Sequence, residues 1–510
     1  MFKSAARSVC FIHGLSVLSR ARLRLRFFPV FLALGLGACT VGPDYQRPEI
    51  DLGAGFEQLQ HNPGWMVAQP GTPAFGQQWW QVFNDGVLDG LMTTLNAQNL
   101  SIEQAQAQYD QALTTVRTAN ASLYPTLGIN ADATRADAPI VLPGSSVVAS
   151  GSGAYTEYDA SLGLSWELDL WGGIRRGVES AQASAQASAA DLAGAKLSAQ
   201  AALASTYFQV RVLDVQADLL DRTVTSYERS LRMTQSLQKA GLTDKGDVAV
   251  AQTQLDTARA QRLDLQWRRA QLENAIAVLL GQPPSSFELP VEVDLAVRPP
   301  QIPVGVPSAL LQRRPDIAAA ERRTAAANAR IGVATAAWFP DLTISASGGY
   351  RSRQFTQWFN APAQFWALGP ALAMAIFDGG RRQAQIEEAE AGFRLQAANY
   401  RLASLRALQE VEDALVQLRV LAQVQDVQAS AVAAARESLR IRRNQYERGL
   451  VDYLSVAVLE TTLFNNERNA IGVMGDRLAA SVRLVAALGG GWSVEQLNNA
   501  GNAGNAVGTP

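Results

Sequence analysis

Residues 241–250 read Gly-Leu-Thr-Asp-Lys-Gly-Asp-Val-Ala-Val, and residues 449–458 read Gly-Leu-Val-Asp-Tyr-Leu-Ser-Val-Ala-Val. The two stretches lie 208 positions apart, and other matches keep this spacing: Ser230-Leu231-Arg232 returns as Ser438-Leu439-Arg440, and Leu280-Gly281 as Leu488-Gly489. Further upstream, Tyr124-Pro125 corresponds to Phe339-Pro340 at a slightly different spacing. A duplication with so long a period indicates two copies of one large structural unit.

Each of the two stretches interrupts a long helical segment. Between about 174 and 238 the chain has no proline and only two glycines, which predicts a helix about 95 Å long. Its second part carries apolar residues at alternating spacings of four and three, which is typical of a coiled coil. The second copy predicts a matching helix over about 381–447. Gly241 and Gly449 are expected to permit the turns into return helices, which end near Leu280 and Leu488.

Before each long helix, the sequence alternates with a period of two. We predict strands over about 125–134 and 158–169 in the first copy, and over about 341–350 and 366–376 in the second. Upstream of the strands, one helix is expected from Trp79-Trp80 to about Leu123, and another from about Pro315 to Trp338. Each copy therefore reads as helix, β-hairpin, very long helix and return helix.

The N-terminus has the composition of a secretory leader. Residues 1–38 contain six basic and no acidic residues and an apolar run, 27–36, that is too short to span a bilayer. The run ends in Leu36-Gly37-Ala38-Cys39, which resembles a bacterial lipobox and predicts acylation of Cys39. The alternative is an ordinary leader with a chance cysteine.

Removal of this leader limits the possible functions. Taking its six basic residues from 44 leaves 38 against 46 acidic residues, a net charge of −8, which argues against a nucleic-acid partner. Cys39 and His61 would be the only cysteine and histidine left. We therefore expect no enzyme active site, no metal site and no cofactor.

These patterns give the following expected organisation: a leader at 1–38, a Gly/Pro-rich arm at 39–76, the first repeat at 77–290, a Pro-rich linker at 291–307, the second repeat at 308–492 and a disordered tail at 493–510. The predicted fold class is therefore a membrane α+β protein with two tandem repeats.

The strands have the length and alternation of outer-membrane strands, with one apolar and one small or polar side. Four strands cannot close a barrel, and an open sheet edge in lipid leaves costly unsatisfied peptide groups. Closure thus requires several chains, and three chains would supply twelve strands and a usable channel. The alternative is that the hairpins pack on the helices as water-soluble sheets.

The chain also resembles the outer-membrane efflux lipoproteins of the TolC-like superfamily, NodT branch. The motifs that carry the resemblance are Gly42-Pro43-Asp44-Tyr45, Trp79-Trp80, Asp169-Leu170-Trp171-Gly172-Gly173, Leu311-Gln312-Arg313-Arg314-Pro315-Asp316-Ile317, Phe339-Pro340, Phe377-Asp378-Gly379-Gly380 and Leu488-Gly489-Gly490-Gly491-Trp492. This resemblance implies a homotrimer with a twelve-stranded β-barrel on a helical periplasmic tunnel. It also implies contact with a periplasmic adaptor that couples the duct to an inner-membrane efflux pump.

The resemblance further implies a gate beside the second helix turn, partly built from acidic residues. Where the family typically has Leu-Asp-Val-Leu-Asp-Ala, this chain has Leu454-Ser455-Val456-Ala457-Val458-Leu459, so both acids are replaced. Our hypothesis is that Asp452, Tyr453, Leu454 and Val458 line an unusually apolar constriction, with Asp244 and Asp247 as the candidates in the first copy. The alternative is that Asp244 and Asp452 only cap the return helices.

Several other residues have two interpretations. Arg443 and Arg448 could pair with the adaptor or be solvated helix charges. Four tryptophans could form an aromatic girdle or simply pack: Trp166, Trp171, Trp358 and Trp366. Arg313-Arg314-Pro315-Asp316 is expected to begin a helix.

The sequence favours a passive, trimeric exit duct of an efflux system. Two rivals are the outer-membrane duct of a type I protein-secretion system and a periplasmic coiled-coil scaffold without a barrel.

Overall fold

The long helices form where proline is absent and alanine, leucine, glutamine and arginine, all good helix formers, dominate. The computed structural model describes residues 40–50, 56–57, 76, 78–136, 140–141, 148–149, 154–293, 299–300, 302 and 313–494. The predicted leader, Cys39, and most of the predicted linker and tail lie outside the described residues.

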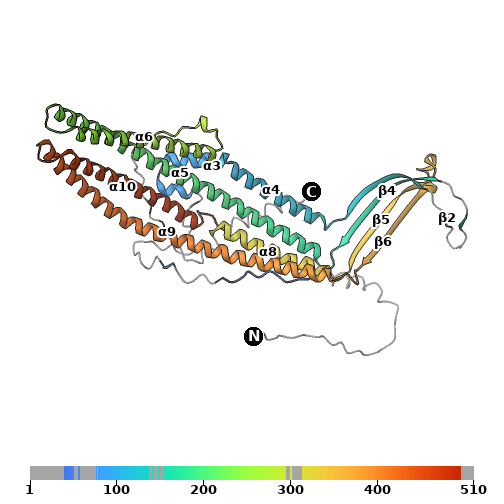
Figure 1. Ribbon diagram of the computed structural model, residues 1–510. Coiled ribbons are helices and arrows are strands. Elements are labelled where there is room, and N and C mark those ends of the chain that lie inside the picture. Colours follow the sequence, from blue (N-terminus) through green and yellow to red (C-terminus); the bar gives the residue numbers. More distant parts are fainter. Residues whose placement is uncertain are drawn as a thin grey trace. The chain divides into compact units, whose positions relative to one another are not determined.

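Each repeat contains one helical hairpin, and the two hairpins have equal dimensions. Helix α5 spans Gly173–Lys239 with 67 residues, and α6 spans Lys245–Leu279 with 35 residues. Helix α9 spans Arg381–Glu447 and α10 spans Tyr453–Ala487, again with 67 and 35 residues. Both hairpin turns lie at the same end of the helices (Figure 1). The duplication seen in the sequence is therefore a duplication of structure.

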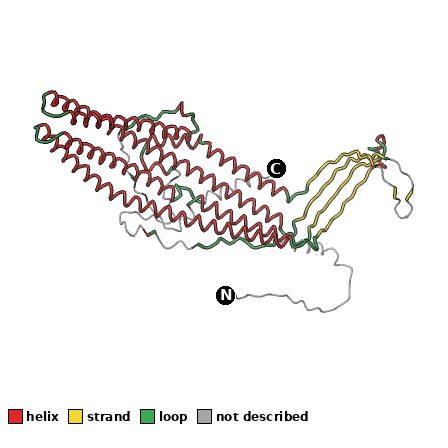
Figure 2. The backbone as a smooth tube through the Cα atoms, viewed as in Figure 1, coloured by secondary structure: helices red, strands yellow, loops and turns green. Residues whose placement is uncertain are grey.

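The chain divides into two units. The sheet unit contains Pro125–Arg175 and Ala336–Ile376, and the helical unit contains Gly42–Tyr124, Arg176–Thr335 and the chain from Phe377 onward. Each repeat contributes to both units, because its β-hairpin interrupts its helices. In Figure 2 the long strands form one sheet and the helices run as long, nearly parallel rods.

The sheet unit is a four-stranded antiparallel sheet. Its strands are β1 at Thr126–Ala136, β4 at Tyr155–Leu168, β5 at Asp341–Ser352 and β6 at Gln364–Ala373, in the order β1-β4-β5-β6. A short ladder joins β2 at Ile140–Val141 to β3 at Val148–Ala149, and two single-turn helices, η4 at Phe355–Gln357 and η5 at Ala361–Ala363, lie between β5 and β6. The last strand was predicted to reach 376 but ends at Ala373, because Ala373 pairs with Asp341, the first residue of β5.

The register places apolar side chains on one face of this sheet. Ile129 lies opposite Leu162, Leu162 opposite Gly348, and Gly348 opposite Trp366, so one row crosses all four strands. Ile129 and Trp366 are about four-fifths exposed. The next residues along each strand, such as Asn130 and Ser161, occupy the opposite face. The sheet therefore presents a wide apolar surface that its own unit does not cover.

The helix predicted from Trp79 to about Leu123 is wrong as a single element. The chain forms η1 at Trp79–Phe83, α3 at Gly86–Gln98 and α4 at Leu100–Ala121. The first break follows from Asn84, whose φ of 51° is left-handed, and the second from Asn99, whose extended backbone caps α4. Short polar side chains favour such caps over a helix interior. In the second repeat, α8 spans Pro315–Ala336.

The two repeats also share a joint between helices. Asn99 donates its side-chain amide to the carbonyl oxygen of Leu279 at 2.6 Å, and Arg314 donates to the carbonyl of Ala487 at 3.0 Å. Each contact fastens the start of a shorter helix to the last turn of a return helix. Leu279 and Ala487 lie 208 positions apart, so the same joint occurs in both copies.

Gly281 and Gly489 follow these last turns, with φ angles of 68° and 95°. A Cβ atom on Gly281 would collide with the carbonyl of Gln98, and one on Gly489 with the carbonyl of Arg313. Left-handed backbone and close approach together explain why glycine stands at both joints.

We expect Gly281→Ala to lower the free energy of unfolding by about 3 kcal/mol, because it combines backbone strain with a backbone collision. Gly241→Ala is the matched control: Gly241 has a φ of 74° but open space around it. The control is expected to lower the free energy of unfolding by about 1 kcal/mol, because only the left-handed backbone conformation is then unfavourable. Thermal melting followed by circular dichroism measures both. Equal losses would contradict the role of the collision.

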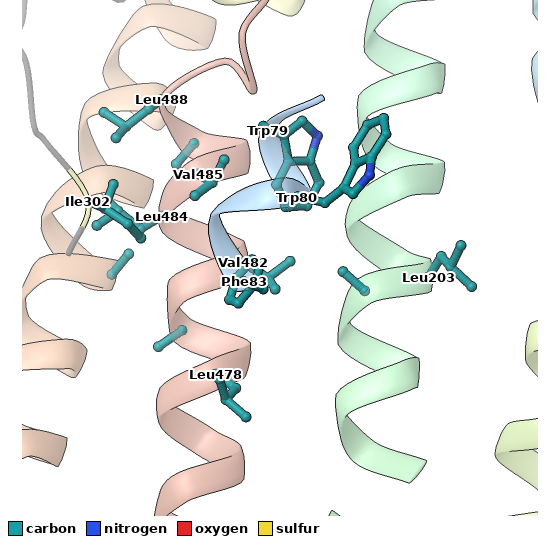
Figure 3. Close-up of a cluster of buried hydrophobic side chains, with 14 of the residues drawn as sticks. Trp79, Trp80, Phe83, Leu203, Ile302, Leu478, Val482, Leu484, Val485 and Leu488 are labelled. Carbon is teal, nitrogen blue, oxygen red and sulfur yellow. The ribbon is translucent and has the colours of Figure 1, made fainter. Parts of the chain in front are cut away.

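The two largest hydrophobic cores of the described residues lie in the helical unit. The larger core joins η1 and α3 to the middle of α5 and α9 and to the ends of α6 and α10; Figure 3 shows Trp79, Trp80 and Phe83 between α5 and α10. The second core lies toward the hairpin turns and contains residues of all four long helices, among them Tyr227, Leu255, Tyr446 and Tyr453. The two hairpins are therefore packed together near their turns.

Candidate functional site

Both hairpin turns are built in the same way. Gly241 has a φ of 74° and Gly449 a φ of 73°. The amide of Leu242 donates to the carbonyl of Leu237 at 2.9 Å, and that of Leu450 to the carbonyl of Gln445 at 3.0 Å. These bonds reach back five residues and close a Schellman motif, which needs a left-handed residue just past the helix end. The structural role predicted for the two glycines agrees with this geometry.

Aspartates begin both return helices. Asp244 accepts the amide of Asp247 at 3.0 Å, and Asp452 accepts the amide of Ser455 at 3.1 Å and its hydroxyl at 2.6 Å. Both aspartates are thus N-caps, as one of the two sequence interpretations proposed. Asp247 accepts a hydrogen bond from the Thr243 hydroxyl, so it also belongs to the first turn.

The hydrogen bond from the Ser455 hydroxyl holds the pKa of Asp452 below its ordinary value. A depressed pKa means that the ionised cap stabilises the folded turn above the unfolded pKa, and that this contribution is lost as the pH falls through the folded pKa. Asp452→Ala should therefore speed amide exchange at Ser455 in neutral buffer and have little effect in strong acid. Asp452→Asn is the control, because asparagine also caps but does not titrate. Hydrogen-exchange mass spectrometry measures this, and a pH-independent effect of the alanine variant would contradict it.

The four predicted gate residues of the second copy separate into two environments. Leu454 and Val458 are more than half exposed and lie one helical turn apart on the same face of α10. Asp452 is exposed at the cap. Tyr453 is only 1% exposed and points into the second core. Its burial does not support the expectation that Tyr453 lines a constriction, so Leu454 and Val458 remain the apolar candidates.

Tyr453 belongs instead to a polar junction between the two hairpins. Its hydroxyl donates to the side-chain oxygen of Gln254 in α6 at 2.9 Å, and the Gln254 amide donates to the carbonyl of Ala457 in α10 at 2.8 Å. The hydroxyls of Thr234 in α5 and Tyr446 in α9 lie 3.2 Å apart. All four long helices therefore contribute to one set of cross-links.

An ion pair whose carboxylate is buried lies within this junction. Arg443 of α9 donates to the carboxylate of Glu460 in α10 at 2.6 Å and to the Ser226 hydroxyl of α5 at 3.2 Å. Ser230 of α5 donates to the same carboxylate oxygen at 3.1 Å. The sequence interpretation considered Arg443 as a partner of the adaptor or as a solvated helix charge, and it missed Glu460. The available signal was its position, because Glu460 continues the buried stripe of Val456 and Ala457 on α10.

The candidate tryptophans also differ. Trp171 stacks on Phe339 at 4.7 Å between ring centroids and donates to the carbonyl of Pro340, so it has a packing role. Trp358 stacks on Phe359 at 4.8 Å and donates to the carbonyl of Tyr350. Trp366 is 79% exposed on the apolar face of the sheet. Of these three, Trp366 best fits the predicted girdle.

In the part of the chain that the structure describes, groups of histidine, cysteine, aspartate or glutamate that could hold a metal ion do not occur. The described helices also include none that is both long and apolar enough to cross a membrane.

Strands with an exposed apolar face and paired hairpins of very long helices define the class of outer-membrane channel proteins. The family model described as outer membrane efflux protein matches residues 91–282 and 306–490, one match for each repeat. The chain therefore belongs to the outer membrane efflux protein family, as the sequence resemblance implied.

Similar proteins agree with this assignment. The probable efflux pump outer membrane protein TtgC of Pseudomonas putida is 30% identical over 460 residues, covering 90% of this chain and 93% of TtgC. The pyoverdine export outer membrane protein OpmQ of Pseudomonas putida is 32% identical over 425 residues, covering 82% and 89%. This chain is thus the outer-membrane exit channel of an efflux system.

Solved structures support the fold. The outer-membrane channel OprN superimposes with a TM-score of 0.80 at 29% identity, covering 89% of this chain and all of that chain. The open state of the Neisseria gonorrhoeae MtrE channel gives a TM-score of 0.77 at 27% identity, covering 89% and 98%. The predicted TolC-like fold, with barrel strands and tunnel helices, is confirmed.

Proposed function

We propose that three copies of this chain form one continuous duct. The observation that carries the proposal is the sheet: one face is apolar and exposed, and β1 and β6 each have a single neighbour in the four-stranded sheet. In lipid such edges leave peptide groups without partners, which closure by other copies removes. Twelve strands leave a channel, whereas eight are filled by side chains.

The duct conducts passively and needs partners to drive it. A periplasmic adaptor binds at the hairpin turns and couples the duct to an inner-membrane pump. Acylation of Cys39 would anchor each chain to the outer membrane. The similar proteins are named for cargoes as different as toluene and pyoverdine, which suggests that this architecture selects little and that the pump selects the cargo.

The test is the mass and conductance of the purified protein. Light scattering in detergent should give three chains per particle, and planar bilayers containing that particle should show discrete current steps. A monomer without current, extracted from membranes by urea, would instead indicate the scaffold alternative. Neighbouring genes for an adaptor and a pump would identify the partners.

At the periplasmic end, Leu454 and Val458 would form an apolar constriction, because threefold symmetry repeats each of them around the axis. Narrow apolar pores exclude water and ions. We expect Leu454→Ser with Val458→Ser to raise the current through the closed channel several-fold. Leu242→Ser is the control, since Leu242 is 74% exposed at the other hairpin turn. Unchanged leakage in the double variant would refute the apolar gate.

A further inference from the structure

The Glu460 carboxylate lies where the two hairpins meet, and α5, α9 and α10 supply its hydrogen-bond partners. Arg443 and Ser230 donate to one oxygen, and the Tyr453 hydroxyl lies 3.5 Å from the other. Ser230 belongs to the α5–α6 hairpin, while Glu460 and Arg443 belong to the α9–α10 hairpin. Parting of the hairpins would therefore take Glu460 away from Ser230 and open its surroundings to water.

The two charges of this pair are buried to very different degrees. The side chain of Glu460 is 3% exposed, whereas that of Arg443 is 41% exposed. A buried carboxylate loses its hydration, and a single charge-assisted bond to a half-exposed guanidinium compensates this loss only in part. Arg443 can turn into water without Glu460, but Glu460 cannot do the same while the hairpins are packed.

Apart from the bond that Arg443 donates to the Ser226 hydroxyl, the remaining cross-links of the junction are neutral. They are the Tyr453–Gln254 bond, the bond from Gln254 to the Ala457 carbonyl and the Thr234–Tyr446 pair. Burial raises the pKa of Tyr227 to about 12 and raises the pKa values of Tyr446 and Tyr453, so these phenols stay protonated in neutral and acidic buffer. Arginine side chains in general stay charged in this pH range. Among the groups around the carboxylate, Glu460 is thus the one that changes charge in mild acid.

Burial also sets the direction of the effect. Loss of hydration raises the pKa of Glu460, although Arg443, Ser230 and Tyr453 oppose this shift. A hydrated carboxylate, as in parted hairpins, would titrate nearer its ordinary value. The packed junction therefore binds the proton more tightly, and acidification favours packing.

We propose that Glu460 is a charge-controlled release element between the two hairpins: its ionised form favours parting of α9–α10 from α5–α6, and its neutral form favours the packed junction. This inference rests on the proposed gating at the helical tip, whose state it would regulate. It predicts opposite effects for the two members of one ion pair. If the ion pair simply held the two hairpins together, by contrast, removal of either member would favour their parting.

The test measures the separation of the hairpin turns directly. Leu242→Cys and Leu450→Cys place spin labels at exposed turn positions, 74% and 68% accessible. Pulsed electron spin resonance on the full-length protein in lipid nanodiscs then reports the distance distribution in neutral and mildly acidic buffer. The parent protein should shift toward shorter distances in acid.

Three variants decide between the mechanisms. Glu460→Gln should raise the population with short distances several-fold at neutral pH and abolish the shift in acid. Arg443→Met should raise the population with long distances. If the methionine variant fails to fold, Arg443→Lys takes its place, and this variant should resemble the parent because it keeps the charge. Glu467→Gln is the matched control, because Glu467 pairs with Arg436 at 2.6 Å within the α9–α10 hairpin. It should change neither the distances nor their pH dependence.

The inference is overturned if Glu460→Gln lengthens the distances as Arg443→Met does, if Glu460→Gln leaves them as in the parent, or if its shift in acid persists. Bilayer currents recorded on the same samples separate this inference from the proposed function. Absence of current in every sample, with the distance shifts as expected, would refute the duct and leave the release element standing.

Discussion

Asp214→Ala is expected to lower the free energy of unfolding by about 3–5 kcal/mol, because it removes the buried carboxylate that Arg211 and Arg269 share. The two arginines would keep only their second carboxylate partners, Glu292 for Arg211 and Glu273 for Arg269. The Asp214 side chain is 1% exposed and that of Arg211 is 5% exposed. Arg269 donates to one carboxylate oxygen at 2.6 Å, and Arg211 to the other at 3.2 Å. One carboxylate thus serves two guanidinium groups from α5 and α6.

This charge cluster also fixes the chain that follows the first repeat. Arg269 donates to the carbonyl of Leu289 at 2.6 Å, and Arg211 donates to that of Pro290 at 2.7 Å. The amide of Glu292 donates to Asp214 at 3.2 Å. Loss of Asp214 would therefore free the segment after α6 and weaken the packing of α5 on α6.

Thermal melting of the purified protein in detergent measures the loss. Asp218→Ala is the matched control, one turn further along α5, where Asp218 pairs with Arg222 at 2.9 Å and the two side chains are 35% and 68% exposed. Exposed pairs contribute little, so the control should stay within about 0.5 kcal/mol of the parent. A similar small loss for Asp214→Ala would mean that the buried arginines find water or other partners.

The elements that the sequence predicted well are those determined by local chemistry. Gly241 and Gly449 end their helices through backbone angles, and Asp244 and Asp452 begin the next ones through their own side chains. Each of these effects involves residues within one turn of each other. The long helices and the β-hairpins could therefore be located with small errors at their ends.

The helix break at Asn99 and the buried side chains that the sequence did not reveal depend on distant contacts. Asn99 ends α3 and begins α4 while its amide reaches Leu279, 180 positions away. Glu460 is buried because α5 covers it, and its partner Ser230 is 230 positions away. The inward direction of Tyr453 likewise depends on Gln254 in another helix. Helical periodicity places such residues on a face of a helix but does not say which neighbour covers that face.

Trp79→Ala is the second substitution with a large expected effect, a loss of about 3–5 kcal/mol in the free energy of unfolding. Trp79 is 1% exposed and packs at right angles to Trp80, and its ring nitrogen donates to Gln200 of α5 at 3.0 Å. Figure 3 shows it between the α5 ribbon and the apolar residues of α10. Removal of the indole would leave a cavity between helices of different repeats.

The position of Trp79 makes the loss specific. It lies between α5 of the first repeat and α10 of the second, so the cavity should weaken the contact between repeats more than either hairpin. Amide exchange should rise around Leu203 and Leu484 and remain unchanged at the distant junction around Tyr453. Trp267→Ala is the control, since Trp267 is 51% exposed on α6 and its loss should cost no more than about 0.5 kcal/mol. If exchange rises equally along all four long helices, the repeats unfold as one cooperative body, and Trp79 stabilises that body as a whole.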